Sequence, residues 1–197
     1  MKKILCLLAL ILFVTACGTE NETPRYNYVK IVMESDEEIV VRLYHQHAPI
    51  TVENFIDLVE RKFFDGSEFH RVVENFMIQG GASARGENAD TIVGEFANNG
   101  IDNPLRHERG VISMARTMIS MDSASSQFFI MHQDTPFLDD DYAAFGRVII
   151  GMEVVDRIAT TEVDLPGSQA PRPIEPEIIR TMILLESVPE ESTPRES

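Results

Sequence analysis

Residues 69–81 read FHRVVENFMIQGG, a stretch in which polar side chains recur between apolar ones. Arg71 precedes two valines, and Gln79 follows the apolar run of residues 76–78. Successive side chains of a β-strand point to opposite faces of the sheet, so Arg71 and Gln79 can share one face while apolar residues fill the other. The pattern therefore predicts β-strands whose polar face either carries function or is simply exposed to water.

Two later stretches have the same character. Residues 110–116 read GVISMAR, and residues 125–130 read SSQFFI, which places Gln127 directly before two phenylalanines. Here too the pattern alone allows both a functional face and a solvated outer surface of the sheet.

The rest of the chain favours more strands. Residues 28–33 and 38–44 are rich in apolar and β-branched residues and flank the polar turn 34–37, which predicts a hairpin. The last apolar run, residues 178–185, predicts a closing strand. Short apolar runs broken by Gly, Asn and Pro lie between, and many short strands favour a β-barrel or sandwich.

Two segments have helical spacing instead. Pro49 opens a pattern of apolar residues at intervals of three and four, with Thr51 as the expected cap and Gly66 beyond the end. A second pattern follows Gly151. These segments predict two helices that cover the β-structure.

Two alternative chemistries rest on weaker signals. His45 and His47 could face one way along a strand as metal ligands, but no cysteine or nearby third histidine completes a site, which favours solvated histidines. Ser113, Ser125 or Ser126 could supply the nucleophile of a Ser-His-Asp triad, but no Gly-x-Ser-x-Gly elbow presents one.

The separated segments together resemble the cyclophilin family of peptidyl-prolyl cis–trans isomerases. The family's hallmark F-H-R-x-x-x-x-F-x-x-Q-G-G is complete at residues 69–81, and its S-M-A and S-Q-F-F-I stretches match residues 113–115 and 126–130. Residues 137–139 and 144–148 fit the family's later blocks. The resemblance implies a mainly β fold, a closed eight-stranded antiparallel β-barrel capped by two α-helices.

The resemblance also implies roles for individual residues. Arg71 matches the family's catalytic arginine, which donates a hydrogen bond to the proline nitrogen of a twisted peptide bond. Gln79 is expected to orient Arg71, and Gln127 to hold the substrate backbone. No cofactor is expected, because the reaction breaks no bond and moves no electrons. The side chains expected to line the proline pocket are those of Phe76, Met77, Phe129 and Leu138.

The adjoining groove, which accepts residues before the proline, is expected to be bordered by Ala115 and Arg116, with Gly86 near its edge. Three substrate-binding positions depart from the best-known eukaryotic pattern: Arg116 replaces Asn, Phe137 replaces Trp and Tyr142 replaces His. The first change is expected to make the groove more basic, and the loss of the indole to weaken binding of cyclosporin.

Composition excludes several protein classes. The 197-residue chain is 44% hydrophobic and 25% charged, as in an ordinary globular protein. Its 17 Lys and Arg against 32 Asp and Glu give a formal net charge of −15, which disfavours contact with a phosphate backbone. We therefore expect no nucleic-acid partner; the expected state is a monomer that binds proline-containing, unfolded or partly folded polypeptides.

The N-terminal segment has the pattern of a signal peptide. After a basic start, residues 4–14 form an unbroken apolar run. It is too short for a membrane-spanning helix, which takes about 20 residues. Small residues precede Cys17, and polar residues follow it. This resembles a bacterial lipoprotein signal with the lipid on Cys17; a plain secretory signal is the alternative.

The expected organisation follows from these patterns. Residues 1–16 form the signal peptide, residues 17–25 the lipidated cysteine and polar tether, residues 26–187 the isomerase domain and residues 188–197 a disordered tail. The expected location is the extracytoplasmic face of a bacterial cell membrane, where the enzyme would assist the folding of secreted or surface proteins. A non-catalytic module that binds proline-containing segments, or a surface adhesin, is the alternative function.

Overall fold

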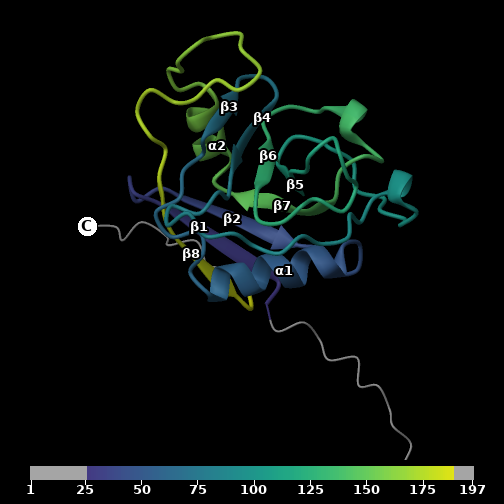
Figure 1. The fold of residues 1–197 in the computed structure, drawn as a ribbon. Coiled ribbons are helices and arrows are strands. Elements are labelled where there is room, and N and C mark those ends of the chain that lie inside the picture. Colours follow the sequence, from purple (N-terminus) through teal and green to yellow (C-terminus); the bar gives the residue numbers. More distant parts are fainter. Residues whose placement is uncertain (1–25, 189–197) are drawn as a thin grey trace, which may run out of the picture.

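The computed structural model describes residues 26–188, so Cys17, the tether and all but the first residue of the expected tail lie outside the described residues. Within the described part, eight β-strands form one antiparallel sheet with the order β3-β4-β6-β5-β7-β2-β1-β8. None of the described helices is long and apolar enough to cross a membrane. Figure 1 shows the sheet curling into a half-barrel with helices at opposite ends.

The expected hairpin is confirmed by β1 (Tyr28–Met33) and β2 (Glu38–Leu43), whose register pairs Ile31 with Ile39. The closing strand is β8 (Ile179–Leu185), which pairs with β1. The remaining strands are β3 (Arg71–Val73), β4 (Met77–Gly80), β5 (Val111–Met114), β6 (Phe128–Met131) and β7 (Ala144–Ile150).

Both expected helices are present, as α1 (Pro49–Glu60) and α2 (Met152–Ala159). The first packs against β8 and the second against β2, β3 and β4. Two short 3₁₀ helices, η1 (Ala97–Asn99) and η2 (Pro136–Leu138), lie in connecting loops.

The expected cap of α1 is wrong. The N-cap residue is Ala48, which makes no side-chain hydrogen bond, and Thr51 lies inside the helix. The buried carboxylate of Glu95 replaces the cap: it accepts hydrogen bonds from the backbone N–H groups of Ile50 and Thr51, at 3.0 and 2.7 Å, and from the Thr51 hydroxyl at 2.6 Å. A carboxylate there satisfies unpaired amides and complements the helix dipole.

A core of aromatic side chains fills the concave side of the sheet. The ring of Phe55, from α1, lies 5.1–5.6 Å from the rings of Phe64, Phe128 and Phe145. All four side chains are buried. This cluster holds α1 to the centre of the sheet.

The expectation of a closed barrel is wrong, because β3 and β8 are the two edges of the sheet and do not pair as strands. They are joined by an isolated bridge between Glu68 and Ile178 and by a few hydrogen bonds, such as Phe69 N–H to the Glu177 carbonyl. The segment before β8 contains prolines at 171, 173 and 176. Proline has no N–H to donate to a strand ladder, so regular pairing ends there.

Candidate functional site

A row of side chains crosses the sheet where strand register aligns them. Arg71 of β3 is directly opposite Gln79 of β4, and Gln79 is directly opposite Phe129 of β6. Residues directly opposite one another in neighbouring strands project from the same face. The fold thus brings the aromatic ring of Phe129 beside a cation and an amide from a distant segment of the sequence.

These residues border a pocket of about 130 Å³, which we call the proline pocket. Most of the residues expected from the sequence line it: Arg71, Phe76, Met77, Gln79, Ala115, Arg116, Phe129, Leu138 and Tyr142. Met77, Phe129 and Leu138 are buried and belong to an apolar cluster separate from the main core. The pocket therefore combines apolar walls with the guanidinium groups of Arg71 and Arg116.

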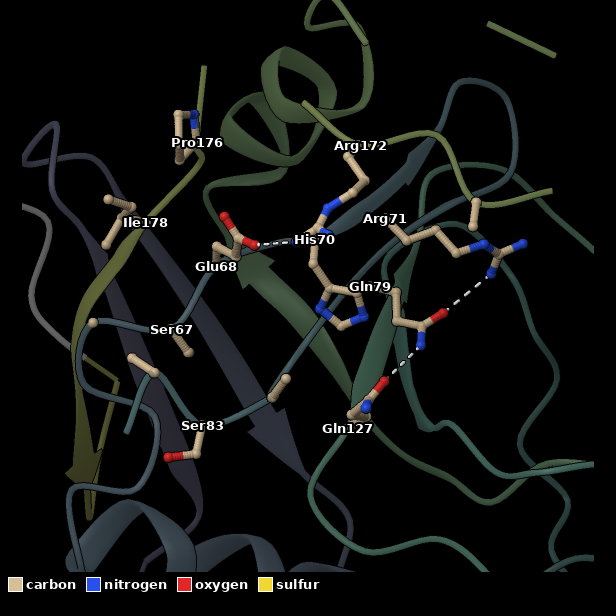
Figure 2. A pocket seen from close by; sticks show the side chains of 14 residues that line it. Ser67, Glu68, His70, Arg71, Gln79, Ser83, Gln127, Arg172, Pro176 and Ile178 are labelled. Carbon is tan, nitrogen blue, oxygen red and sulfur yellow. Dashed lines mark hydrogen bonds and ion pairs between the residues drawn. The ribbon is translucent and has the colours of Figure 1, made fainter. Parts of the chain in front are cut away.

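A chain of hydrogen bonds fixes the guanidinium. Arg71 Nη1 donates to Gln79 Oε1 at 3.1 Å, and Gln79 Nε2 donates to Gln127 Oε1 at 3.0 Å (Figure 2). Arg71 Nε donates to the backbone carbonyl of Gln169 at 2.8 Å. The contact with Gln169 could not be anticipated from the sequence, since it depends on a carbonyl 98 residues away.

The charge of Arg71 has no carboxylate partner among residues 26–188. Burial lowers the pKa of Arg71, but an arginine remains protonated at any physiological pH. Arg71 Cζ lies 5.9 Å from the centre of the Phe76 ring. The pocket thus holds a half-buried positive charge, with guanidinium donors in excess of the partners the protein provides.

Phe137 is not a wall of the proline pocket. Its side chain is 74% exposed and stacks on Phe76 at 5.9 Å between ring centres. It lies at the outer rim, where a bound chain passing over Phe76 would meet it.

Arg116 lies in a second hollow of about 190 Å³, which also includes Ala115 and Gln127. Its guanidinium donates to the Asp141 carbonyl through Nε at 2.8 Å and lies 4.9 Å from the centre of the Tyr142 ring. Its Nη2 is 3.8 Å from an Asp141 carboxylate oxygen. Because Asp141 offsets this charge, the groove is less basic than the sequence suggested.

Two other expected site residues are not found at the proline pocket: one lies elsewhere on the surface, and the other lies outside residues 26–188. Gly86 is exposed, adopts φ = 71° and lines neither the proline pocket nor the hollow beside Arg116. Cys17 lies outside the described residues. The apolar loop after Arg116 presents Met118 and Ile119, 82% and 96% exposed, next to the groove.

A buried polar network behind the pocket was not anticipated. His107 Nδ1 lies 3.0 Å from Asp139 Oδ1, and its Nε2 lies 3.1 Å from Ser113 Oγ. This is a Ser-His-Asp arrangement, but Ser113 is fully buried and cannot meet a substrate. The His107 ring stacks on Phe129 at 5.9 Å, so the network supports the pocket wall instead.

His45 and His47, considered above as metal ligands, lie in no cluster of metal-binding side chains within the described residues. Within residues 26–188 no group of three or more His, Cys, Asp or Glu is arranged to hold a metal ion. His45 Nε2 instead lies 2.7 Å from the Tyr26 carbonyl.

Burial makes the stability of this region dependent on pH. It lowers the pKa of His107, although the hydrogen bond and charge of Asp139 act in the opposite direction, and it also lowers the pKa of His70. The unfolded chain therefore binds more protons than the folded one below about pH 6.5. We predict that the free energy of unfolding falls as the pH drops from about 7 to about 5.

Chemical denaturation at a series of pH values measures this effect. Replacing His107 with glutamine, which keeps hydrogen-bonding capacity but does not titrate, should flatten part of the slope. An equal slope in the protein and in its His107→Gln variant would contradict the role of His107.

Sequence comparison with known proteins identifies related chains. The model of the family described as cyclophilin type peptidyl-prolyl cis-trans isomerase/CLD matches residues 28–183. Peptidyl-prolyl cis-trans isomerase A of Dickeya dadantii is 37% identical over 185 residues, which cover 91% of this chain and 96% of the relative. A peptidyl-prolyl cis-trans isomerase of Acinetobacter baylyi is 41% identical over 143 residues, covering 70% and 75%.

Solved structures show the same fold. A cyclophilin type isomerase of Cryptosporidium parvum, determined in the presence of the dipeptide Ala-Pro, matches with a TM-score of 0.65 at 24% identity. The match covers 80% of this chain and 98% of that one. The cyclophilin AquaCyp293 of Hirschia baltica matches with a TM-score of 0.67 at 22% identity, covering 84% and 76%. From its sequence and its fold, this chain belongs to the cyclophilin-type peptidyl-prolyl cis–trans isomerase family.

Proposed function

We propose that the protein accelerates cis–trans isomerisation of the peptide bond before proline. The observation that carries this proposal is the hydrogen-bonded guanidinium of Arg71 at the edge of an apolar pocket. Apolar walls of this kind suit a proline ring, and the relatives named as isomerases are 37–41% identical to this chain.

The physical problem is a rotational barrier of about 18–20 kcal/mol, which arises because the nitrogen lone pair is shared with the carbonyl group. In the twisted state this sharing is lost, and the lone pair of the proline nitrogen can accept a hydrogen bond. A donor that meets the nitrogen only in that state lowers the barrier, because only differential binding accelerates a reaction. Arg71 borders the proline pocket with donors to spare, and Gln79 and Gln169 hold it in place, whereas Arg116 is engaged by Asp141.

Exchange spectroscopy by NMR on a short Xaa-Pro peptide tests the proposal. The full chain should raise the exchange rate between cis and trans isomers in proportion to enzyme concentration. Binding of the peptide without faster exchange would instead favour the alternative, a binding module or adhesin on the same fold.

We further propose that the protein is a lipoprotein anchored through Cys17 on the extracytoplasmic face of a bacterial membrane, where it assists the folding of secreted or surface proteins. The support is the sequence: an apolar run, small residues, a cysteine and a polar tether in that order. Two acyl chains provide the stable anchoring that a single chain does not. The proposed boundaries are residues 1–16 for the signal peptide, 17–25 for the lipidated cysteine and tether, 26–187 for the isomerase domain and 188–197 for the tail.

We predict that the protein produced in bacteria with its own leader is found with the membranes and has a mass that corresponds to cleavage before Cys17 plus lipid. The Cys17→Ala variant should lack the lipid mass. Identical masses, apart from the single-residue difference, would refute lipidation at this residue.

A further inference from the structure

A cavity of about 710 Å³ lies beside the proline pocket, whose own volume is about 130 Å³. Most of its walls come from three segments: residues 66–71 leading into β3, residues 82–84 after β4, and residues 170–178 before β8 (Figure 2). Gln79 and Gln127 complete the lining. The cavity therefore lies over the seam between the two edge strands. The roles assigned above to the proline pocket do not use this cavity.

The lining favours an uncharged side chain. Ala82, Ala84, Pro176 and Ile178 contribute apolar surface. Of the charged side chains in the wall, Arg172 and Glu68 pair with each other, since Arg172 Nη2 donates to Glu68 Oε1 at 2.8 Å. The guanidinium of Arg71 is already hydrogen-bonded to Gln79 and to the Gln169 carbonyl. A charged ligand would have to compete with the ion pair between Arg172 and Glu68. An apolar side chain would only exchange its contact with water for contact with the apolar part of the wall, which is favourable.

His70 gives the cavity a flat, neutral ring. Figure 2 shows its imidazole projecting between the labelled Ser67 and Gln79. Burial lowers the pKa of His70; the charge and backbone hydrogen bond of Glu68 act in the opposite direction, and the charges of Arg172 and Arg71 lower it again, so the ring is neutral at pH 7. A neutral ring offers a face against which an aromatic side chain can pack.

The cavity adjoins the proline pocket. Arg71 and Gln79 line both spaces, and Gln127 lines the cavity and the groove beside Arg116. The hydrogen-bonded row formed by Arg71, Gln79 and Gln127 thus lies at the boundary between the two spaces. Consecutive Cα atoms are 3.8 Å apart, so a chain with proline on one side can place a nearby side chain on the other.

We propose that this cavity is a second substrate subsite, which takes a large aromatic, uncharged side chain of the same client within a few residues of the proline. The inference rests on the proposed isomerase function. It predicts a sequence preference that the proline pocket alone does not provide.

A set of peptides tests the proposal. Each contains one proline in an otherwise alanine background, and tyrosine is moved through the three positions before and the three positions after the proline. With the full chain, kcat/KM for at least one tyrosine peptide should exceed that for the all-alanine peptide by about tenfold, a typical gain for filling an apolar subsite.

Two variants that fill the cavity and one matched control test whether the preference for tyrosine arises from this cavity. Ala84→Trp fills the cavity from the segment after β4, and Ala170→Trp fills it from the segment before β8; both positions are exposed, so the larger side chain need not disturb the core. Each should reduce the ratio of kcat/KM between tyrosine and alanine peptides to about one. Ala84→Ser leaves the cavity open and should keep the ratio.

The outcomes separate the two hypotheses. No preference for any tyrosine position, or a preference that survives in both tryptophan variants, would overturn the subsite. If the unmodified protein isomerises no peptide at all, the proposed function fails. NMR titration then decides on the subsite through affinity: tighter binding of a tyrosine peptide to the unmodified protein than to the tryptophan variants supports it, and equal affinity refutes it.

Discussion

Replacing Arg71 with alanine is expected to lower kcat/KM for Xaa-Pro isomerisation by about 100-fold to 1,000-fold, the effect typical of losing one preorganised donor to a transition state. The guanidinium is half-buried, carries an uncompensated charge and is held by Gln79 and Gln169. The apolar walls remain in the variant. Peptide affinity should therefore fall much less than the rate.

The Arg71→Lys variant is the matched control, because it keeps the charge but not the planar fork. A lysine cannot contact Gln79 and the Gln169 carbonyl while also presenting a donor in fixed orientation, so its rate should lie nearer to that of Arg71→Ala than to that of the unmodified protein. Exchange spectroscopy by NMR measures the rates, and circular dichroism checks folding. Full activity in a folded Arg71→Ala variant would refute the role given to this residue.

The second large effect is a contrast between two neighbouring phenylalanines of β6. Phe128 is fully buried and its ring lies 5.6–6.0 Å from those of Phe55, Phe64 and Phe69. Phe128→Ala should lower the free energy of unfolding by about 3–5 kcal/mol, because the cavity it leaves is enclosed by the core. Denaturant titration measures this change.

Phe129 points to the opposite face and lines the proline pocket. Truncation to alanine there opens onto an existing pocket, so the loss of stability should be smaller than for Phe128→Ala. The loss of kcat/KM should be about tenfold or more, because an apolar wall of the proline pocket is removed. Equal losses of stability and of activity in the two variants would contradict the assignment of the two faces.

Several elements follow from sequence periodicity alone. The helical spacing after Pro49 places Val52, Phe55 and Val59 on one face, and all three are buried in α1. The β1–β2 hairpin likewise lies where alternating residues and a polar turn predicted it. These patterns succeed because backbone geometry fixes which side chains share a face over a few residues.

The errors arise where distant segments meet. The cap of α1 is Glu95 instead of Thr51, and the contact spans 44 residues. The barrel does not close, because the prolines before β8 end regular strand pairing there. These prolines are visible in the sequence and could have predicted the open edge. Gly86 lies apart from the proline pocket. The catalytic triad was disfavoured by the sequence, and the buried network of Ser113, His107 and Asp139 supports Phe129 instead.

The sequence by itself determined the identity of the hallmark residues, the β-strand character of the segments around Arg71 and Gln79, and the alternation that lets these two side chains share one face. Only the tertiary structure decided that Arg71, Gln79 and Phe129 form one row, that Gln169 fixes the guanidinium, and that a large cavity opens beside the proline pocket. The physical reason is that side-chain periodicity is a local property of the backbone, whereas strand register and the packing of loops depend on contacts between residues far apart in the chain.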